Sequence, residues 1–432
     1  MTNTRIRISA LLLAISGLLT PHAAAFGAGK APKTHELTFS GKATPEQYYV
    51  PVYTSFTVPE GIVKISVTQH LGSDEARPGN LDLGIFDERG AGFEGPGFRG
   101  WSGGARRSFE IGETEATPGY LAGRINPGRW TVIQMPTTAG RTTDWTLKIT
   151  LTEGPRAKKL PAPSYAAPQL NDKPGWYRIA PHVHTVHSDG RLTPAEVIAL
   201  GKASGLDGIV STDHNTTSAL LHWGEIQDPE FLVINGVEVT YGQGHWNIFG
   251  LDPHAWIDFR IHHNDTLRYR KAVAKARKAG RLLVANHPYN LDFLYDVTPM
   301  DGIEVWNSAW SPANERAVEL WHTLLVGGNR KFAVASTDFH RGGNIASPHT
   351  VVRAEALSAE AVIDAIAAGR SYVARDASVE IGMQVRNSAT PVQHADIGDT
   401  LLRSGGMQAW VYSYDGFTVL EIGAINPDRI VV

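Results

Sequence analysis

The sequence contains no cysteine among its 432 residues. This absence excludes disulfide bonds and all metal sites that use thiolate ligands. Any metal ion in the protein would have to be held by histidine, aspartate and glutamate. The chain has 17 histidines and 43 acidic residues, so only their arrangement can identify a site.

A strong excess of positive charge is also absent, since the net charge is −3. This balance argues against a nucleic-acid-binding protein that relies on a basic surface. The most basic stretch, Lys271–Lys278, has the pattern of a solvated helix face. We therefore expect no nucleic-acid partner.

Only one long apolar run is present, at the N-terminus. Arg5 and Arg7 precede the apolar stretch Ile8–Leu19, and Ala23–Ala25 offers small residues for cleavage, so residues 1–25 read as a secretory signal. A membrane anchor is the alternative, but the run is shorter than the roughly 20 residues that a span needs. We expect an exported protein, periplasmic or secreted, with no membrane span after cleavage. Loss of Arg5 and Arg7 takes its net charge from −3 to −5.

Several catalytic motifs are missing as well. The sequence has no glycine-rich phosphate loop, no Gly-x-Ser-x-Gly nucleophile elbow and no dinucleotide fingerprint. These absences disfavour a serine hydrolase and a Rossmann oxidoreductase.

Residues 36–152 show short alternating runs separated by turn residues, with no helical periodicity of useful length. This texture predicts an all-β sandwich of the jelly-roll kind. The strands are expected at Gln47–Val58, Ile62–Gln69, Leu81–Phe86, Trp130–Gln134 and Trp145–Leu151. A loop rich in glycine, aromatic and basic residues, Phe98–Arg107, either contacts substrate or packs on the neighbouring domain, and we favour packing.

After a linker at residues 153–174, strand-like and helix-like stretches alternate over 175–374. Such βα units predict parallel strands in an α/β barrel or open sheet. Residues 375–432 return to short β runs and are expected to form a C-terminal β segment. In the central region, strands are expected at Trp176–His184, Leu206–Thr212, Phe231–Thr240, His245–Leu251, Leu282–Ala285, Gly302–Trp306, Lys331–Ser336 and Thr350–Ala354, and helices at 194–203, 265–279, 313–326 and 359–368.

Histidines and carboxylates follow these predicted strands. His182 and His184 are two residues apart on a strand, so their imidazoles point to the same side. Chemistry in α/β folds collects at the carboxyl ends of strands. The other candidates at such ends are His214, Glu238, His287, Asp338 and His340, with Asp189 in the loop after the first strand.

Histidine and carboxylate ligands without thiols suit Zn²⁺, Mn²⁺ or Fe²⁺, and we expect Zn²⁺ first. The ligands outnumber what one ion takes, which favours two or three ions with Glu238 as a bridge. A water shared by such ions becomes a hydroxide at neutral pH. The expected reaction is therefore hydrolysis of an ester or phosphoester.

The ordered motifs resemble the polymerase and histidinol phosphatase (PHP) superfamily of metal-dependent hydrolases. They read His182-x-His184-Thr185, Ser188-Asp189-Gly190, Thr212-Asp213-His214, Asn286-His287-Pro288 and Ser336-x-Asp338-x-His340. The segments Gly236–Thr240, Gly244–Gly250 and Glu304–Asn307, together with the β domain in front, are similar to the carbaryl-hydrolase-like (CehA/McbA) branch.

The resemblance implies a distorted (β/α)7 barrel with three groups of ligands. One group would be His182, His184, Glu238 and Asp338; a second would be Glu238, His245 and His287; a third would be Asp189, His214 and His340. Glu238 and Asp338 would take part in catalysis. Arg341 would bind an anionic oxygen, or form a surface salt bridge instead.

The resemblance also suggests a small substrate that carries a carboxylic ester, carbamate or phosphoester. A phosphodiesterase or phosphatase outside the cytoplasm is the alternative enzyme. A polysaccharide-binding protein with a metal-stabilised barrel is the alternative from another class.

Several further residues have two readings. Asp213 either orients a ligand or caps a turn. His187 is expected to be a loop or pocket residue. The aromatic residues Tyr241, Tyr289 and Trp306 would line the pocket or belong to the core.

Overall fold

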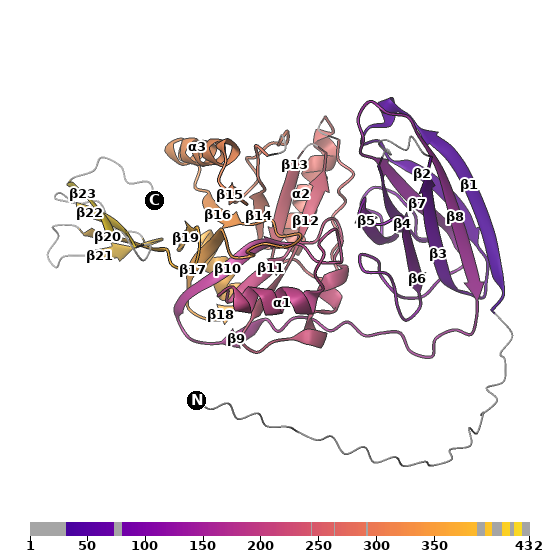
Figure 1. The fold of residues 1–432 in the computed structure, drawn as a ribbon, viewed down its shortest axis with the longest axis horizontal. Helices are drawn as coiled ribbons and strands as arrows, with labels where there is room; N and C mark the ends of the chain where they lie inside the picture. The colour runs from indigo at the N-terminus through magenta and orange to yellow at the C-terminus, as the bar shows by residue number, and fades with distance from the viewer. Residues whose placement is uncertain are drawn as a thin grey trace, which may run out of the picture.

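The computed structural model describes residues 32–72, 80–242, 244–262, 264–290, 293–386, 394–399, 408–414 and 419–425. The expected signal segment 1–25 lies outside these residues. Figure 1 shows a β-sandwich, in indigo and purple, beside a larger α/β unit in magenta to orange. A small sheet formed by the C-terminal strands lies at the far side of that unit.

The sandwich consists of two four-stranded antiparallel sheets. One has the order β1-β8-β3-β6 and the other β2-β7-β4-β5, which is the strand order of a jelly roll. The strands are β1 (Thr34–Ala43), β2 (Val52–Val58), β3 (Ile62–Leu71), β4 (Leu81–Phe86), β5 (Phe98–Gly103), β6 (Ser108–Gly112), β7 (Gly128–Pro136) and β8 (Thr143–Glu153). The strand expected from Gln47 begins later, at Val52, because Pro45–Gln47 form a capped turn of 3-10 helix.

The central unit is built on one nine-stranded sheet with the order β16-β15-β14-β13-β12-β11-β10-β17-β19. Its strands are β10 (Gly175–Val183), β11 (Gly208–Ser211), β12 (Leu232–Tyr241), β13 (Gly244–Phe249), β14 (Leu282–Ala285), β15 (Gly302–Asn307), β16 (Phe332–Ser336), β17 (His349–Ala354) and β19 (Ser371–Ala374). The sheet curls until β16 meets β10, where Ser336 Oγ donates to the His182 carbonyl at 3.0 Å. It is therefore a nearly closed, barrel-like sheet.

The strict alternation of a (β/α)7 barrel is not what the described residues show. β13 is antiparallel to both β12 and β14, and β17 is antiparallel to β10. β13 starts three residues after Tyr241 ends β12, and this is too short for a crossover helix. The described part of the chain has four α-helices: α1 (Pro194–Ala203), α2 (Thr266–Ala279), α3 (Pro312–Val326) and α4 (Ala359–Ala367).

Local sequence explains where these helices begin. Thr193 caps α1 through a hydrogen bond from the Glu196 amide, and Glu196 completes the predicted capping box. Asp265 caps α2 and Ser358 caps α4 in the same way, each accepting a bond from a first-turn amide.

The sandwich and the barrel share one buried hydrophobic cluster at their interface, and the sandwich has a separate core between its two sheets. Phe86, Phe98 and Trp101 of the sandwich belong to the same buried cluster as the barrel side chains. The rings of Phe98 and Trp256 stack with centroids 4.3 Å apart. Arg260 lies over the Phe86 ring at 4.5 Å. The sheet that contains β4 and β5 thus faces the barrel.

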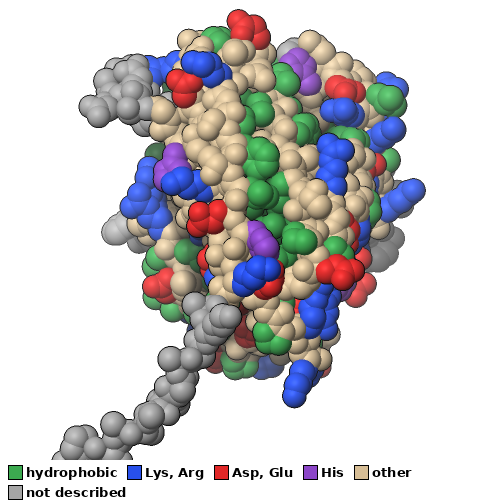
Figure 2. Space-filling model, turned by 90° about the vertical axis from the view of Figure 1, so that its right-hand side faces the viewer, with side chains coloured by type: hydrophobic (Ala, Val, Ile, Leu, Met, Phe, Trp, Pro, Cys, Tyr) green, Lys and Arg blue, Asp and Glu red, His purple; other side chains and the backbone are tan. Residues whose placement is uncertain are grey.

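The opposite, outer face of the sandwich carries charges of both signs. Figure 2 shows blue and red side chains interspersed around a column of apolar ones, with no large patch of one sign. Pairs such as Lys42–Asp144 at 2.9 Å and Lys64–Glu110 at 3.2 Å account for part of this mixture. No helix among the described residues is long and apolar enough to cross a membrane.

Two smaller sheets complete the fold. β9 (Gln169–Asn171), within the predicted linker, pairs with β18 (Leu357–Ser358). The C-terminal sheet has the order β21-β20-β22-β23 and comprises β20 (Glu380–Arg386), β21 (His394–Asp396), β22 (Gln408–Tyr414) and β23 (Val419–Ile425).

Candidate metal centre

The end of β10 sets the position of two histidines. Val183 points into the core and is fully buried, so His182 and His184 point to the opposite side. Both imidazoles are buried, and each directs its Nε2 atom at the Asp338 carboxylate, at 3.2 Å and 3.0 Å. The predicted pair of imidazoles therefore converges on one carboxylate.

Glu238, on β12, is fully buried at the middle of the cluster. Five imidazoles surround its two oxygens. The nitrogen-to-oxygen distances are 3.3 Å to His182, 3.5 Å to His184, 2.7 Å to His214, 3.2 Å to His245 and 3.5 Å to His287. A carboxylate in this position can contact more than one metal ion, as a bridging ligand does.

The structure brings all nine predicted ligands together. Their donor atoms form four overlapping groups in which every atom lies within 4.8 Å of the others. The groups are His184 with Asp189, His214 and His340; His182 with His287 and Asp338; His182 with His184 and Glu238; and Glu238 with His245 and His287. The last group is the one that the resemblance implied, whereas His184 also joins the group of Asp189.

The ring nitrogens that face away from the cluster are held by other groups. His182 Nδ1 lies 3.0 Å from Glu304 Oε1, and His340 Nδ1 lies 2.8 Å from the Asp338 carbonyl oxygen. His214 differs, because its Nδ1 lies between Glu238 Oε2 at 2.7 Å and Thr240 Oγ1 at 2.5 Å, so its Nε2 faces Asp189 and His340. Such contacts fix the tautomer and the orientation of a ligating histidine, and leave Nε2 free to bind.

Glu304 is the functional residue that sequence reasoning missed. It belongs to the segment Glu304–Asn307, for which the sequence indicated a family resemblance but no role of the glutamate. Its side chain is buried, and besides His182 it accepts bonds from the His287 amide at 3.0 Å and from Asn307 Nδ2 at 3.1 Å. A signal was available, because an acid inside the apolar strand Gly302–Asn307 requires a buried partner.

The donor set fits divalent metal ions. His182 Nε2, Glu238 Oε2 and His287 Nδ1 are buried and have no well-aligned hydrogen bond among the described residues, although His214 Nδ1 lies 2.7 Å from Glu238 Oε2. Each such atom costs about 1–3 kcal/mol when left unsatisfied. A cation bound between Nε2 of His182 and the carboxylates would remove this cost for two of these atoms, and nitrogen and oxygen donors suit Zn²⁺, Mn²⁺ or Fe²⁺.

The electrostatics of the cluster keep its carboxylates anionic. Burial alone would raise the pKa values of Glu238 and Asp338, yet the surrounding histidines, His182 first, hold both well below their usual range. Burial lowers the pKa of His184 to about 4, so this imidazole is neutral at pH 7. Burial would also lower the pKa of His214, but Glu238 and Asp189 raise it to about 9.

The loop that carries Asp189 is held from two sides. Asp213 accepts bonds from the Thr185 amide at 2.8 Å and from Ser188 Oγ at 2.7 Å, and Ser188 Oγ lies 3.4 Å from His184 Nδ1. Asp213 therefore orients the loop and, through Ser188, a ligand. From the sandwich, Arg106 donates to the carbonyls of Val186 and, at 3.0 Å, of Ser188.

Strained backbone accompanies two of the ligands. His287 has φ of 27° and Asp338 has φ of 52°, in the left-handed region that disfavours side chains. Residues held in this region cluster at functional sites. In this backbone conformation the side chains of His287 and Asp338, which follow β14 and β16, point into the cluster.

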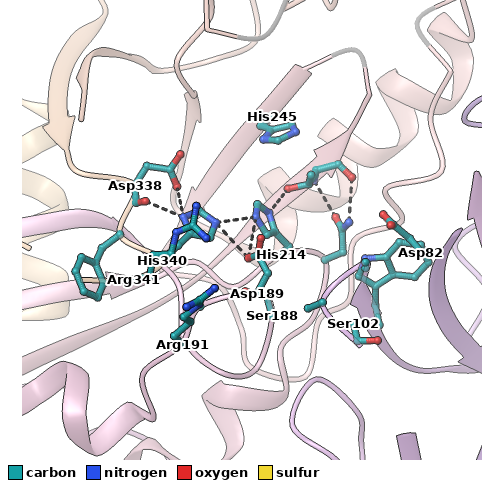
Figure 3. A pocket seen from close by; sticks show the side chains of 18 of the residues that line it. Asp82, Ser102, Ser188, Asp189, Arg191, His214, His245, Asp338, His340 and Arg341 are labelled. Atoms are coloured by element: carbon teal, nitrogen blue, oxygen red, sulfur yellow. Dashed lines mark hydrogen bonds and ion pairs between the residues drawn. The ribbon is translucent and has the colours of Figure 1, made fainter. Parts of the chain in front are cut away.

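A cavity of about 1400 Å³ opens over the cluster, between the sandwich and the barrel. Its walls include the sandwich segment from Trp101 to Arg106, which thus both packs on the barrel and lines the pocket. The prediction of a loop over Phe98–Arg107 was wrong for its first part, because Phe98–Gly103 pair with β4 as strand β5. Tyr241 also lines it, whereas Tyr289 and Trp306 are not among its lining residues. Arg341 lies in the wall with an exposed side chain (Figure 3) and forms no ion pair within the described part of the chain.

Comparisons with known proteins give weak likenesses. No family model matches the chain, and a search of curated proteins found no relative. Among solved structures, a two-domain Bacteroides vulgatus protein containing a predicted PHP-like metal-dependent phosphoesterase is 16% identical, with a TM-score of 0.37 over 64% of this chain and 92% of its own. An amidohydrolase from Chromobacterium violaceum is 19% identical, with a TM-score of 0.31 over 39% of this chain and 89% of its own. Both scores are below 0.5, so the functional argument rests on the side chains of this chain.

Proposed function

We propose that this protein is a metal-dependent hydrolase that cleaves a carboxylic ester, carbamate or phosphoester bond with water. One observation carries the proposal. Glu238, fully buried, is surrounded by five imidazoles, and two ring nitrogens of this cluster, His182 Nε2 and His287 Nδ1, have no hydrogen bond from the described residues. A purely structural core would not gather so many titratable groups below an open cavity.

Each group in the site has a separate task. Divalent ions held by the nine ligands would act as Lewis acids and would lower the pKa of a water molecule. Glu238 would bridge the ligand groups, and Asp338, whose side chain is 21% exposed and lines the cavity, would orient the attacking water. Arg341, at the cavity wall, would neutralise an anionic oxygen of the substrate.

The ordered motifs support membership of the PHP superfamily, in its carbaryl-hydrolase-like branch. The signal-like pattern of residues 1–25 is the support for proposing export to the periplasm or to the medium. A small substrate that carries the ester, carbamate or phosphoester fits a cavity of about 1400 Å³.

The proposal is tested by metal analysis combined with turnover of aryl probes. The purified protein is stripped with a chelator, reloaded with Zn²⁺, Mn²⁺ or Fe²⁺, and assayed on para-nitrophenyl acetate, an aryl carbamate and para-nitrophenyl phosphate. We expect activity on at least one probe, loss of that activity on stripping, and its return on reloading. Full metal loading without turnover of any probe would favour the polysaccharide-binding alternative instead.

The change His182→Ala supplies the matching variant. It removes a buried imidazole that faces both Glu238 and Asp338. We expect turnover to fall by more than the roughly 10–100-fold that loss of a supporting residue costs. His322→Ala, on the exposed face of α3, is the control and should leave turnover unchanged. Unchanged turnover in His182→Ala would contradict the proposed site.

A further inference from the structure

Strand alternation turns one carboxylate of the sandwich toward the metal centre. On β4, Leu81, Leu83 and Ile85 point into the core of the sandwich. Asp82 and Phe86 therefore occupy the opposite face, and Phe86 packs in the cluster that the sandwich shares with the barrel. Asp82 lies on the same face but at the cavity, where it is half-buried.

Asp82 differs from the other acids of the cavity wall. Three carboxylates line the cavity, Asp82, Asp189 and Asp338, and the last two belong to ligand groups. Asp82 belongs to none of these groups and comes from the other domain. Figure 3 shows it at the opposite end of the pocket from Arg341, with His214, Asp189 and His340 between them.

Hydrogen bonds hold one oxygen of Asp82 and leave the other free. Oδ1 accepts from Asn80 Nδ2 at 2.7 Å and from Thr137 Oγ1 at 3.4 Å. No hydrogen bond from the described residues reaches Oδ2. Gly104 makes room for this arrangement, because a Cβ there would lie 2.4 Å from Asn80 Nδ2 and 3.0 Å from Asp82 Oδ1. The glycine-rich loop therefore packs against a carboxyl group with one oxygen available.

We propose that Asp82 is the general acid that protonates the leaving group of the substrate. The inference rests on the hydrolase function proposed above. In the reaction, the water oxygen forms a bond to the carbonyl carbon or phosphorus, and the bond to the leaving oxygen or nitrogen breaks. The proton of Asp82 passes to that leaving atom. The proton lost by the water goes to solvent, and Asp82 regains a proton from solvent before the next turnover.

The surroundings of Asp82 suit this task. Burial raises its pKa to about 7, against the opposing effects of the bonds from Thr137 and Asn80 and of the nearby Arg107. The titratable and charged groups that face it are Arg107 from the sandwich, Tyr49 from the segment before β2, and His214 from the barrel. A carboxyl group whose pKa is raised by burial thus lines the same cavity as the candidate metal ligands, and this position suits a general acid.

The wild-type protein provides the first test. Para-nitrophenolate leaves without a proton, whereas phenolate and alkoxide need one. In the metal-loaded protein, we expect kcat for phenyl and alkyl esters, or the matching phosphoesters, to fall as pH rises past the pKa of Asp82, since its carboxyl group is then deprotonated. The kcat for the para-nitrophenyl probe should show no such fall. Equal pH profiles for good and poor leaving groups would overturn the proposal.

The variant Asp82→Asn provides the second test. It keeps the shape of the side chain but cannot donate an acidic proton. We expect kcat to drop by about 10²–10⁴-fold on phenyl and alkyl substrates, with little change on the para-nitrophenyl probe and unchanged metal content. Asp144→Asn, an exposed acid on the other sheet of the sandwich, is the matched control.

These outcomes separate the two proposals. If the wild-type protein turns over no probe, the hydrolase function fails. If it turns over the probes but Asp82→Asn slows good and poor leaving groups equally, or slows neither, only the role of Asp82 fails.

Discussion

At the scale of single residues, we expect the groups that hydrogen-bond the second ring nitrogen of each histidine to set the affinity of the centre for metal. Glu304 holds His182 Nδ1 with one oxygen and the His287 amide with the other. It therefore fixes two ligands from a strand that contributes no ligand itself.

Glu304→Gln should weaken metal binding. The amide keeps the size of the side chain but loses the charge that orients the imidazolium or the Nδ1–H tautomer of His182. We expect metal affinity to fall about 10–100-fold, measured by competition with a chromophoric chelator. Glu319→Gln, on the exposed surface of α3, should have no effect. Equal affinities for both variants would contradict the supporting role of Glu304.

The grouping of the ligands can be tested at the same scale. His245 shares a group only with Glu238 and His287, whereas His340 shares one only with His184, Asp189 and His214. We expect His245→Ala and His340→Ala each to lose a different metal site and to keep the remaining ones, as measured by metal content after saturation and desalting. Loss of all bound metal in both variants would show that the groups form a single site.

At the scale of elements, the sandwich segment Trp101–Arg106 lines the cavity over the candidate metal centre and contacts the barrel loop that carries Asp189. Arg106 binds two carbonyls of the loop that leads to Asp189, and Gly119 of the sandwich donates to Ser218 Oγ of the barrel at 3.1 Å. A wall of the cavity and a brace for a ligand loop thus come from one segment. The favoured reading of this segment, packing on the neighbouring domain, is therefore confirmed, and the segment also lines the cavity.

Arg106→Ala should loosen the Asp189 loop more than the fold. We expect affinity for the ion near Asp189 to fall about 10-fold, because the loop loses two charge-assisted hydrogen bonds. The melting temperature should fall by only a few degrees. Metal titration and thermal unfolding are the measurements, with Arg129→Ala, which bonds only Ser55 within the sandwich, as control. A large drop in melting temperature without a change in affinity would contradict this role.

At the scale of the whole molecule, the two domains are held by a buried cation. Arg260 is 4% exposed, pairs with Asp258, and donates to the carbonyls of Ala91 and Gly92 on the sandwich. Asp258 in turn accepts from the Glu94 amide at 2.8 Å. This interface adjoins the buried hydrophobic cluster to which both domains contribute side chains. We therefore expect one cooperative unfolding transition for sandwich and barrel.

Arg260→Met should destabilise this unit strongly, since Asp258 is fully buried and would lose its partner. Breaking a buried pair in this way costs about 3–5 kcal/mol. The free energy of unfolding in urea measures the loss, and Asp258→Asn combined with Arg260→Met should recover part of it. Two separate transitions in the wild-type protein, or a loss below about 1 kcal/mol in Arg260→Met, would contradict a shared core.

The sequence by itself determined the local elements and the set of candidate ligands. Capping residues such as Thr193 and Ser358, glycine at helix ends and period-two alternation are local signals, so α1, α4 and β4 lie where they were expected. Eight of the nine candidate ligands could be named because histidine and acid follow strands whose ends converge, and the family resemblance added His245. The absence of cysteine had already fixed the donor chemistry.

Only the tertiary structure decided which side chains meet across the chain. β13 pairs antiparallel with β14, which departs from the parallel order of a (β/α)7 barrel. The direction of a strand in a sheet depends on the neighbouring strand with which it pairs, and its own residues do not specify that neighbour. The sharing of His184 between groups, the support from Glu304 and the approach of Asp82 from the sandwich all join residues distant in sequence. Periodicity carries no information about such contacts, since they arise from the packing of separate elements.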